Sequence, residues 1–190
     1  MSNFKRFGTI PTLNYLLVAL GTDDLSRKSI RENLDNQKDT RVSVGLFNIL
    51  DDYDGFGDEV TFNKYFIYLK KVIDRVKEEY CYERVELKSL LVVKLLANGI
   101  ISEHIDEAGM YKYAHRIHIP LITNNDCVFT VGGECGRMSV GEIVEIDNTV
   151  AHSVVNGSED RVHIVIDIVG FHDKYDFKAL HNRIPEGFYI

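Results

Sequence analysis

Residues 161–167 read Arg-Val-His-Ile-Val-Ile-Asp, and this run of alternating side chains is the stretch that decides the fold. Successive side chains of a β-strand point to opposite faces, so one face of this run is entirely aliphatic. The other face carries Arg161, His163 and Asp167, with Val165 between them. A polar face of this kind is expected where a strand lines the ligand cavity of a small barrel. A solvent-exposed face on an edge strand is the alternative.

Residues 116–119, Arg-Ile-His-Ile, repeat the same scheme and place Arg116 and His118 on one face. Two strands would thus offer an arginine and a histidine to a common interior. A planar guanidinium binds a carboxylate through two parallel hydrogen bonds, which makes Arg116 and Arg161 candidates for anion binding. Arg116 is also positioned to pair with Asp167 and stiffen the cavity wall.

Helices gather in the first half of the chain and short strands in the second half. A short helix is predicted at 24–34 and a longer one from Thr61 to about Glu79, with apolar side chains at helical spacing for packing against a sheet. Turn-bounded β-like runs follow at 90–93, 117–119, 127–129, 142–146, 152–155 and 161–166, and residues 132–137 are predicted to form a hairpin turn. This order predicts a mainly β fold with supporting helices, a double-stranded β-helix (jelly roll, cupin-like).

The chain length favours one domain, residues 1–190. We expect a helix-richer part at about 1–83, a β-helix core at about 84–170 and a C-terminal tail at 171–190. A net charge of −7 disfavours binding to nucleic acid or to an anionic membrane surface. The three cysteines form no CxxC pair, and the apolar run at 15–20 is too short for a signal peptide or a membrane span. We therefore expect a cytoplasmic protein.

A candidate metal site is formed by His104, Asp106 and His152. Residues two apart in a strand share a face, so His104 and Asp106 could bind one ion. His152 follows a turn at 147–151 and begins a strand. Two imidazoles and one carboxylate are the ligand set that leaves open positions on ferrous ion. The sequence therefore indicates an iron oxygenase, with Arg161 as the candidate site for a dicarboxylate cosubstrate.

Taken in order, segments 104–106, 116–121, 141–142, 151–156 and 161–167 resemble the aspartyl/asparaginyl β-hydroxylase family, whose members are cupin-like Fe(II)- and 2-oxoglutarate-dependent oxygenases. The resemblance implies that His104, Asp106 and His152 bind Fe(II). It implies that Arg161 holds the distal carboxylate of 2-oxoglutarate, assisted by Arg116 and His118. The first hundred residues or so match only loosely.

Asp106 sets this chain apart from the family's protein-modifying mammalian branch, which lacks the carboxylate ligand. The resemblance is closer to hydroxylases of free amino acids such as proline, and a halogenase is disfavoured because halide would need the position of the carboxylate. A serine that contacts the cosubstrate in part of the family has no clear counterpart in residues 90–94.

The expected reaction uses O2 to hydroxylate an amino acid, free or within a peptide or protein, while 2-oxoglutarate is converted to succinate and CO2. Two alternatives are another metal-dependent cupin enzyme that does not need Arg161, and a non-catalytic cupin-like binding module. Tyr111, Lys112 and Tyr113 are candidates either for substrate contact at a cavity lip or for packing. The sequence leaves the substrate and the oligomeric state open.

Overall fold

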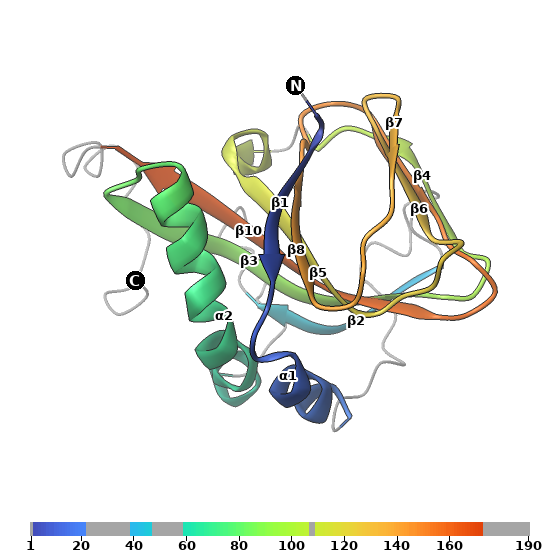
Figure 1. Ribbon diagram of the computed structural model, residues 1–190, viewed down its shortest axis with the longest axis horizontal. Helices are drawn as coiled ribbons and strands as arrows, with labels where there is room; N and C mark the ends of the chain where they lie inside the picture. Colours follow the sequence, from blue (N-terminus) through green and yellow to red (C-terminus); the bar gives the residue numbers. More distant parts are fainter. Residues whose placement is uncertain (1, 22–38, 47–58, 107–108, 173–190) are drawn as a thin grey trace.

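Two antiparallel β-sheets face each other, and two helices lie against the outer face of the larger sheet (Figure 1). This computed structural model describes residues 2–21, 39–46, 59–106 and 109–172. The larger sheet has the order β1 (Phe4–Thr9), β8 (Glu142–Ile146), β5 (His115–Ile122), β10 (Arg161–Phe171), β3 (Arg84–Leu95) and β2 (Thr40–Leu46). The smaller sheet has the order β4 (Ile100–His104), β9 (His152–Val155), β6 (Val128–Val131) and β7 (Glu134–Gly136). The predicted jelly roll is confirmed.

Strand β10 lies inside the larger sheet, between β5 and β3. Its aliphatic face, with Val162, Ile164 and Ile166, belongs to the core between this sheet and the helices. On its other face, Arg161, His163 and Asp167 are buried at no more than 1% exposure. The interpretation as an exposed edge strand is therefore wrong, and the polar face lines the interior.

Helix α2 (Glu59–Glu79) agrees with the predicted helix from Thr61 to about Glu79. Its buried side chains share one core with the aliphatic faces of β3, β5 and β10; they are Tyr65, Leu69, Val72, Ile73 and Val76. Helix α1 (Leu13–Leu20) packs into the same core through Leu16 and Ala19. The helix predicted at 24–34 lies outside the described residues.

Strands β1 and β2 lie in the part of the chain that was expected to be richer in helix. They form the two edges of the larger sheet, where a strand needs pairing on one side only. On β1, only Phe4 is buried, so the segment has no clear alternation of apolar and polar side chains. Sequence periodicity was therefore a weak signal for this strand.

The predicted hairpin at 132–137 is confirmed by the pairing of β6 with β7. The turn residues Gly132 and Gly133 have φ angles of +54° and +80°, which glycine adopts at little cost in a tight hairpin. The three cysteines are free thiols. Among the helices of the described ranges, none is long and apolar enough to cross a membrane.

Candidate metal centre

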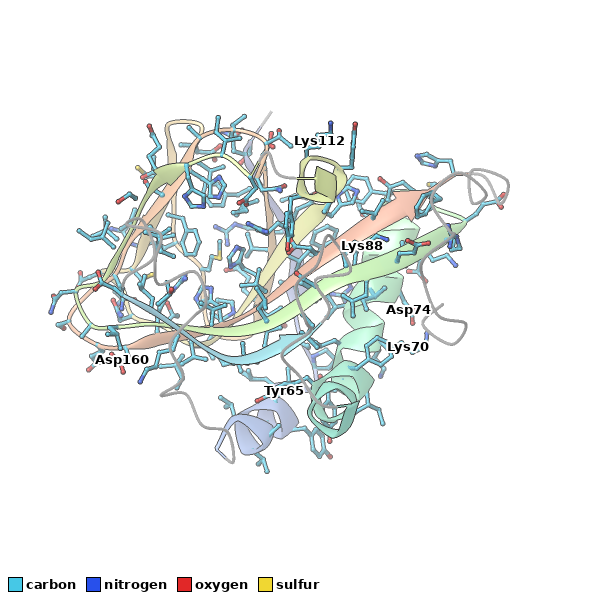
Figure 2. All side chains as sticks on the ribbon, turned by 180° about the vertical axis from the view of Figure 1, so that it is seen from behind. Tyr65, Lys70, Asp74, Lys88, Lys112 and Asp160 are labelled. Atoms are coloured by element: carbon cyan, nitrogen blue, oxygen red, sulfur yellow. The ribbon has the colours of Figure 1, made fainter. Side chains whose placement is uncertain are left out.

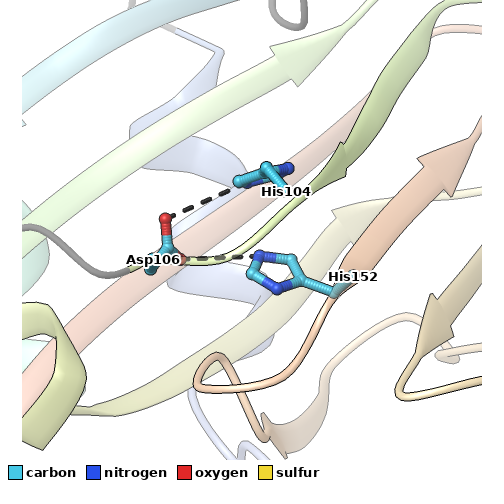
Figure 3. A group of neighbouring side chains, drawn as sticks. All are labelled: His104, Asp106 and His152. Carbon is cyan, nitrogen blue, oxygen red and sulfur yellow. Dashed lines mark ion pairs between the residues drawn. The ribbon is translucent and has the colours of Figure 1, made fainter.

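His104, Asp106 and His152 converge at one end of the smaller sheet (Figure 3). Each residue offers one potential ligand atom, and the three atoms lie within 4.8 Å of one another. His104 is the last residue of β4 and His152 is the first residue of β9, and the two are direct partners in the antiparallel pairing of these strands. Strand pairing therefore brings together two histidines that are far apart in the sequence.

An irregularity in β4 determines which side chain faces His152. Ile101 is paired with Val154, so regular pairing would set Glu103 opposite His152, but His104 occupies that position instead. One extra residue in β4 thus forms a β-bulge, a feature that re-aims side chains beside functional sites. Without the bulge, Glu103 would take the place of His104 at the site.

Backbone hydrogen bonds orient both imidazole rings. Nδ1 of His104 lies 2.8 Å from the Ser102 carbonyl oxygen, and Nδ1 of His152 lies 2.9 Å from the Val150 carbonyl oxygen. A carbonyl only accepts, so each Nδ1 carries the proton and each Nε2 keeps a free lone pair.

The two Nε2 atoms face the same carboxylate. Nε2 of His104 lies 3.9 Å from one oxygen of Asp106, and Nε2 of His152 lies 3.5 Å from the other. Metal–ligand bonds of about 2 Å place neighbouring ligand atoms roughly 3 Å apart, so small adjustments would complete a three-ligand site. The arrangement fits a divalent metal ion.

Asp106 is not in the same strand as His104, contrary to expectation, because β4 ends at His104. The segment that follows β4 is instead held by hydrogen bonds to the turn before β9. The amide of Asp106 donates to the Asn148 carbonyl oxygen at 3.3 Å, and the buried Asn148 side chain donates to the Tyr111 carbonyl oxygen at 2.8 Å. Asn148 thus supports the chain at Asp106 and again at Tyr111.

Arg116 links the candidate ligand Asp106 to the centre of the larger sheet. One of its terminal nitrogens contacts Asp106, and its Nε donates to Asp167 at 2.8 Å, which confirms the predicted pair of Arg116 with Asp167. Ser89 on β3 donates to the same Asp167 carboxylate. The chain of contacts from Ser89 through Asp167 and Arg116 fixes the orientation of Asp106.

The electrostatic balance at this site keeps Asp106 ionised. Burial alone would raise the pKa of Asp106, but the neighbouring His152 and the charge of Arg116 lower it to about 2. Burial is also the main cause that lowers the pKa of His104. A deprotonated carboxylate next to a neutral imidazole is the state that binds a metal ion.

Arg161 lies deeper in the interior, 1% exposed, with its guanidinium 4.9 Å from the centre of the Phe129 ring. Its Nη1 lies 3.4 Å from Nδ1 of His163, it also forms a side-chain hydrogen bond with Cys127, and within the described ranges no ion pair joins it to a carboxylate. Burial lowers the pKa of Arg161. A buried guanidinium without a counter-ion is costly, and an anionic ligand would offset this cost.

His118 is buried near Arg161, and neither of its ring nitrogens has a hydrogen-bond partner in the described part of the chain. Burial, followed by the charge of Arg161, lowers its pKa well below the usual value. A neutral, unpaired imidazole beside a buried guanidinium is available to donate to a ligand.

The residues selected from the sequence thus lie in the interior between the two sheets, where they form two clusters. His104, Asp106 and His152 form the candidate metal centre, and Arg116 contacts that centre rather than the space around Arg161. Tyr111, 8% exposed, lies beneath the Arg116 guanidinium, whereas the side chains of Lys112 (labelled in Figure 2) and Tyr113 are exposed. Tyr111 alone of these three lies close to the candidate site.

Two supporting residues were not selected from the sequence. Asn148 sits in an ordinary turn sequence, so only its contacts reveal its role. Ser89 precedes the run at 90–93 and is paired with Asp167 just where β3 and β10 lose their regular register. This pairing follows the regular register that runs from Arg161 and Leu95, and because it joins two distant strands, the sequence of β3 alone does not reveal it.

The chain matches a known protein family. The family model for aspartyl/asparaginyl beta-hydroxylase matches residues 62–170, which include every candidate ligand and both arginines. No curated protein sequence matches the chain.

Several solved structures share the fold at low sequence identity. An oxidoreductase of the 2OG-Fe(II) oxygenase family from Burkholderia pseudomallei is 13% identical, with a TM-score of 0.66 over 84% of this chain and 80% of that one. A Pseudomonas putida prolyl-4-hydroxylase is 8% identical, with a TM-score of 0.54 over 88% and 92% of the two chains. A Trichoplax adhaerens prolyl hydroxylase, solved with a hypoxia inducible factor peptide, is 11% identical, with a TM-score of 0.57 over 88% and 84%. With the family match spanning more than half of its length, the chain belongs to the aspartyl/asparaginyl beta-hydroxylase family.

Proposed function

We propose that this protein is an Fe(II)- and 2-oxoglutarate-dependent dioxygenase that hydroxylates an amino acid, free or within a peptide. The observation that carries the proposal is the convergence of His104, Asp106 and His152 on one point, with both Nε2 atoms turned toward the Asp106 carboxylate. Family membership supports the same assignment.

The metal would be held by Nε2 of His104, Nε2 of His152 and a carboxylate oxygen of Asp106. Three protein ligands leave open positions for a cosubstrate and for O2. With 2-oxoglutarate and O2, Fe(II) in such a site supplies the oxidant for C–H hydroxylation, and succinate and CO2 are formed.

The protein's own contribution is orientation and the exclusion of water. Arg116, held by Asp167, keeps Asp106 in place. Arg161 would bind the distal carboxylate of 2-oxoglutarate, because it is a buried cation whose polar contacts in the described ranges are with Cys127 and His163 and not with a carboxylate. His118 would add a hydrogen bond to the same cosubstrate.

A small amino acid is the substrate class we favour. Asp106 supplies the carboxylate ligand that the family's protein-modifying mammalian branch lacks, and the free-amino-acid branch, which acts on substrates such as proline, has this ligand. Two of the structural relatives, from Pseudomonas putida and Trichoplax adhaerens, are prolyl hydroxylases. A screen should therefore begin with free proline and other free amino acids, followed by short proline-containing peptides.

Anaerobic titration with Fe(II) and then 2-oxoglutarate tests the proposal. We expect a visible charge-transfer band that requires both additions. Asp106→Ala should abolish the band by removing a metal ligand, and Arg161→Ala should shift the 2-oxoglutarate dependence to much higher concentration. On exposure to O2, succinate should form in amounts that rise when the correct substrate is present.

Two other results would contradict the proposal. Tight metal binding with no response to 2-oxoglutarate, together with full activity of Arg161→Ala on any substrate found, would indicate a metal cupin that needs no cosubstrate. Failure of the reduced protein to bind any divalent metal would indicate a binding module.

A further inference from the structure

His163 is a buried histidine that the proposed function has not yet used. It lies on the interior face of β10, two residues after Arg161, and is 0% exposed. Its ring stacks on Phe129 of the opposite sheet, with 5.8 Å between ring centres and an interplanar angle of 15°. Its position is therefore fixed from both sheets.

The contact with Arg161 determines which ring nitrogen of His163 carries the proton. A guanidinium has only donors, so at 3.4 Å from Nη1 of Arg161, Nδ1 of His163 must accept. Burial and the neighbouring Arg161 lower the pKa of His163 well below its usual value, so the ring is neutral. In a neutral imidazole with an accepting Nδ1, the proton is on Nε2.

This Nε2–H group is a buried donor with no partner among the described residues. A buried donor without a partner has lost its hydrogen bonds to water and gained none in return, so native proteins rarely keep one without a ligand or a water molecule to accept from it. The neighbouring Nε of Arg161 is also without a partner within the same ranges. Both donors are buried without a partner, and because one of them belongs to a cation, an anionic ligand is favoured in this part of the interior.

The order of side chains along the interior relates this site to the candidate metal centre. On β5, Arg116 is paired with Asp167, His118 with Val165 and Pro120 with His163. The charges of both Asp106 and Arg161 affect the pKa of His118, whereas the pKa of His163 is affected by Arg161 and His118. His163 therefore lies beyond His118 on the side away from the metal centre.

We propose that His163 is a second residue for the distal carboxylate of 2-oxoglutarate, donating its Nε2 proton to that carboxylate beside Arg161. This inference rests on the proposed function, because it assumes that 2-oxoglutarate is the cosubstrate. It explains why a histidine stands two residues after the arginine on a strand whose other face is aliphatic. It also gives the unpaired Nε2–H group of His163 an acceptor.

The test compares two ligands that differ only at the distal end. 2-Oxopentanoate has the chain length and the 2-oxo acid group of 2-oxoglutarate but ends in a methyl group. Binding of each to the Mn(II)-loaded protein would be measured by calorimetry, without turnover. His163→Phe keeps the stacked ring and removes both nitrogens, while His163→Gln keeps one donor and one acceptor. His172→Phe, at an exposed position directly after β10, is the matched control.

We expect His163→Phe to weaken 2-oxoglutarate binding by about tenfold or more, the size of a hydrogen bond to a charged group. Binding of 2-oxopentanoate and of Mn(II) should not change. His163→Gln should recover part of the loss, and His172→Phe should behave like the wild type. If His163→Phe fails to fold, the ratio of the two affinities in His163→Gln still reports on the contact.

The outcomes separate the two proposals. If wild-type protein binds 2-oxoglutarate and His163→Phe binds it equally well, or loses both ligands in parallel, the role of His163 is refuted and the proposed function stands. If Mn(II)-loaded wild-type protein binds no 2-oxoglutarate, the proposed function fails and this inference fails with it.

Discussion

At the scale of single residues, the site depends on buried charges that compensate one another. Asp167 is 0% exposed and accepts from Ser89 on one strand and from Arg116 on the other. Arg116 in turn contacts Asp106. A carboxylate at position 167 thus keeps the guanidinium in place, and the guanidinium keeps the candidate metal ligand ionised and oriented.

Asp167→Asn should therefore be strongly destabilising. The amide has one acceptor oxygen where the carboxylate has two, and it leaves Arg116 with a single acidic partner. We expect the free energy of unfolding to fall by about 3–5 kcal/mol, as for other broken buried pairs. Urea denaturation would measure the change, with the exposed Asp126→Asn as a control expected to be close to neutral. A loss below about 1 kcal/mol would show that Arg116 is held by other contacts.

At the scale of elements, the sequence predicts the helices and strands that have a clear hydrophobic periodicity, but it does not predict features that depend on how the strands pair. The alternation in β10 and the helical spacing in α2 identify both elements and their buried faces. The bulge in β4 and the pairing of Ser89 with Asp167 depend on contacts between strands that are distant in the sequence, and no local pattern predicts them. The sequence thus identified the candidate ligands, while the route by which Asp106 reaches the site became clear only from its contacts.

The segment carrying Asp106 depends on Asn148, so Asn148→Ala should weaken metal binding without removing a ligand. The substitution deletes the side-chain hydrogen bond to the Tyr111 carbonyl oxygen and leaves the Ala114 amide as its donor, so the segment that follows Asp106 loses one of its anchors. Supporting residues of this kind typically change metal affinity by about tenfold or more. Mn(II) titration would measure the affinity, with the neighbouring exposed Thr149→Ala as the control. Equal affinities in the two variants would refute the supporting role.

A second contact between elements, just after the end of α2, is expected to make the protein less stable at alkaline pH. The hydroxyl of Tyr80 donates to Glu145 on β8 at 2.8 Å. Burial and this hydrogen bond raise the pKa of Tyr80 above its ordinary value of 10.0. Because the folded state favours the protonated phenol, the stabilisation is complete below pH 10 and is lost as the pH rises through the raised pKa.

Tyr80→Phe should lower the free energy of unfolding by roughly 1–2 kcal/mol at neutral pH, the size of one hydrogen bond to a carboxylate. The difference between variant and wild type should stay constant up to about pH 9 and shrink above about pH 10. Urea denaturation across this range would measure it. A difference that persists unchanged at the highest pH would place the effect in ring packing rather than in the hydroxyl.

At the scale of the whole molecule, the interior of the jelly roll combines an aliphatic shell with a charged centre. Arg161, His163 and His118 are buried among apolar side chains, and in the described ranges Arg161 has no carboxylate to offset its charge. Such an interior is less stable alone than an apolar one of the same volume would be. The ligand-free protein is therefore expected to have a lower free energy of unfolding than the protein with its anionic ligand bound.

Arg161→Met should accordingly separate stability from ligand response. Removing the uncompensated buried charge should raise the free energy of unfolding of the ligand-free protein by about 1–2 kcal/mol, since the lost contact with Phe129 offsets part of the gain. Wild-type protein with Mn(II) and 2-oxoglutarate at about 100 times its dissociation constant should gain about 2.7 kcal/mol, or roughly 5–10 °C in melting temperature. The variant should show the metal-induced part of the shift but none from 2-oxoglutarate. Thermal denaturation of both proteins with metal alone, and with metal plus 2-oxoglutarate, would decide the matter. A variant that is less stable when free yet still stabilised by 2-oxoglutarate would show that Arg161 holds the fold together and does not bind the cosubstrate.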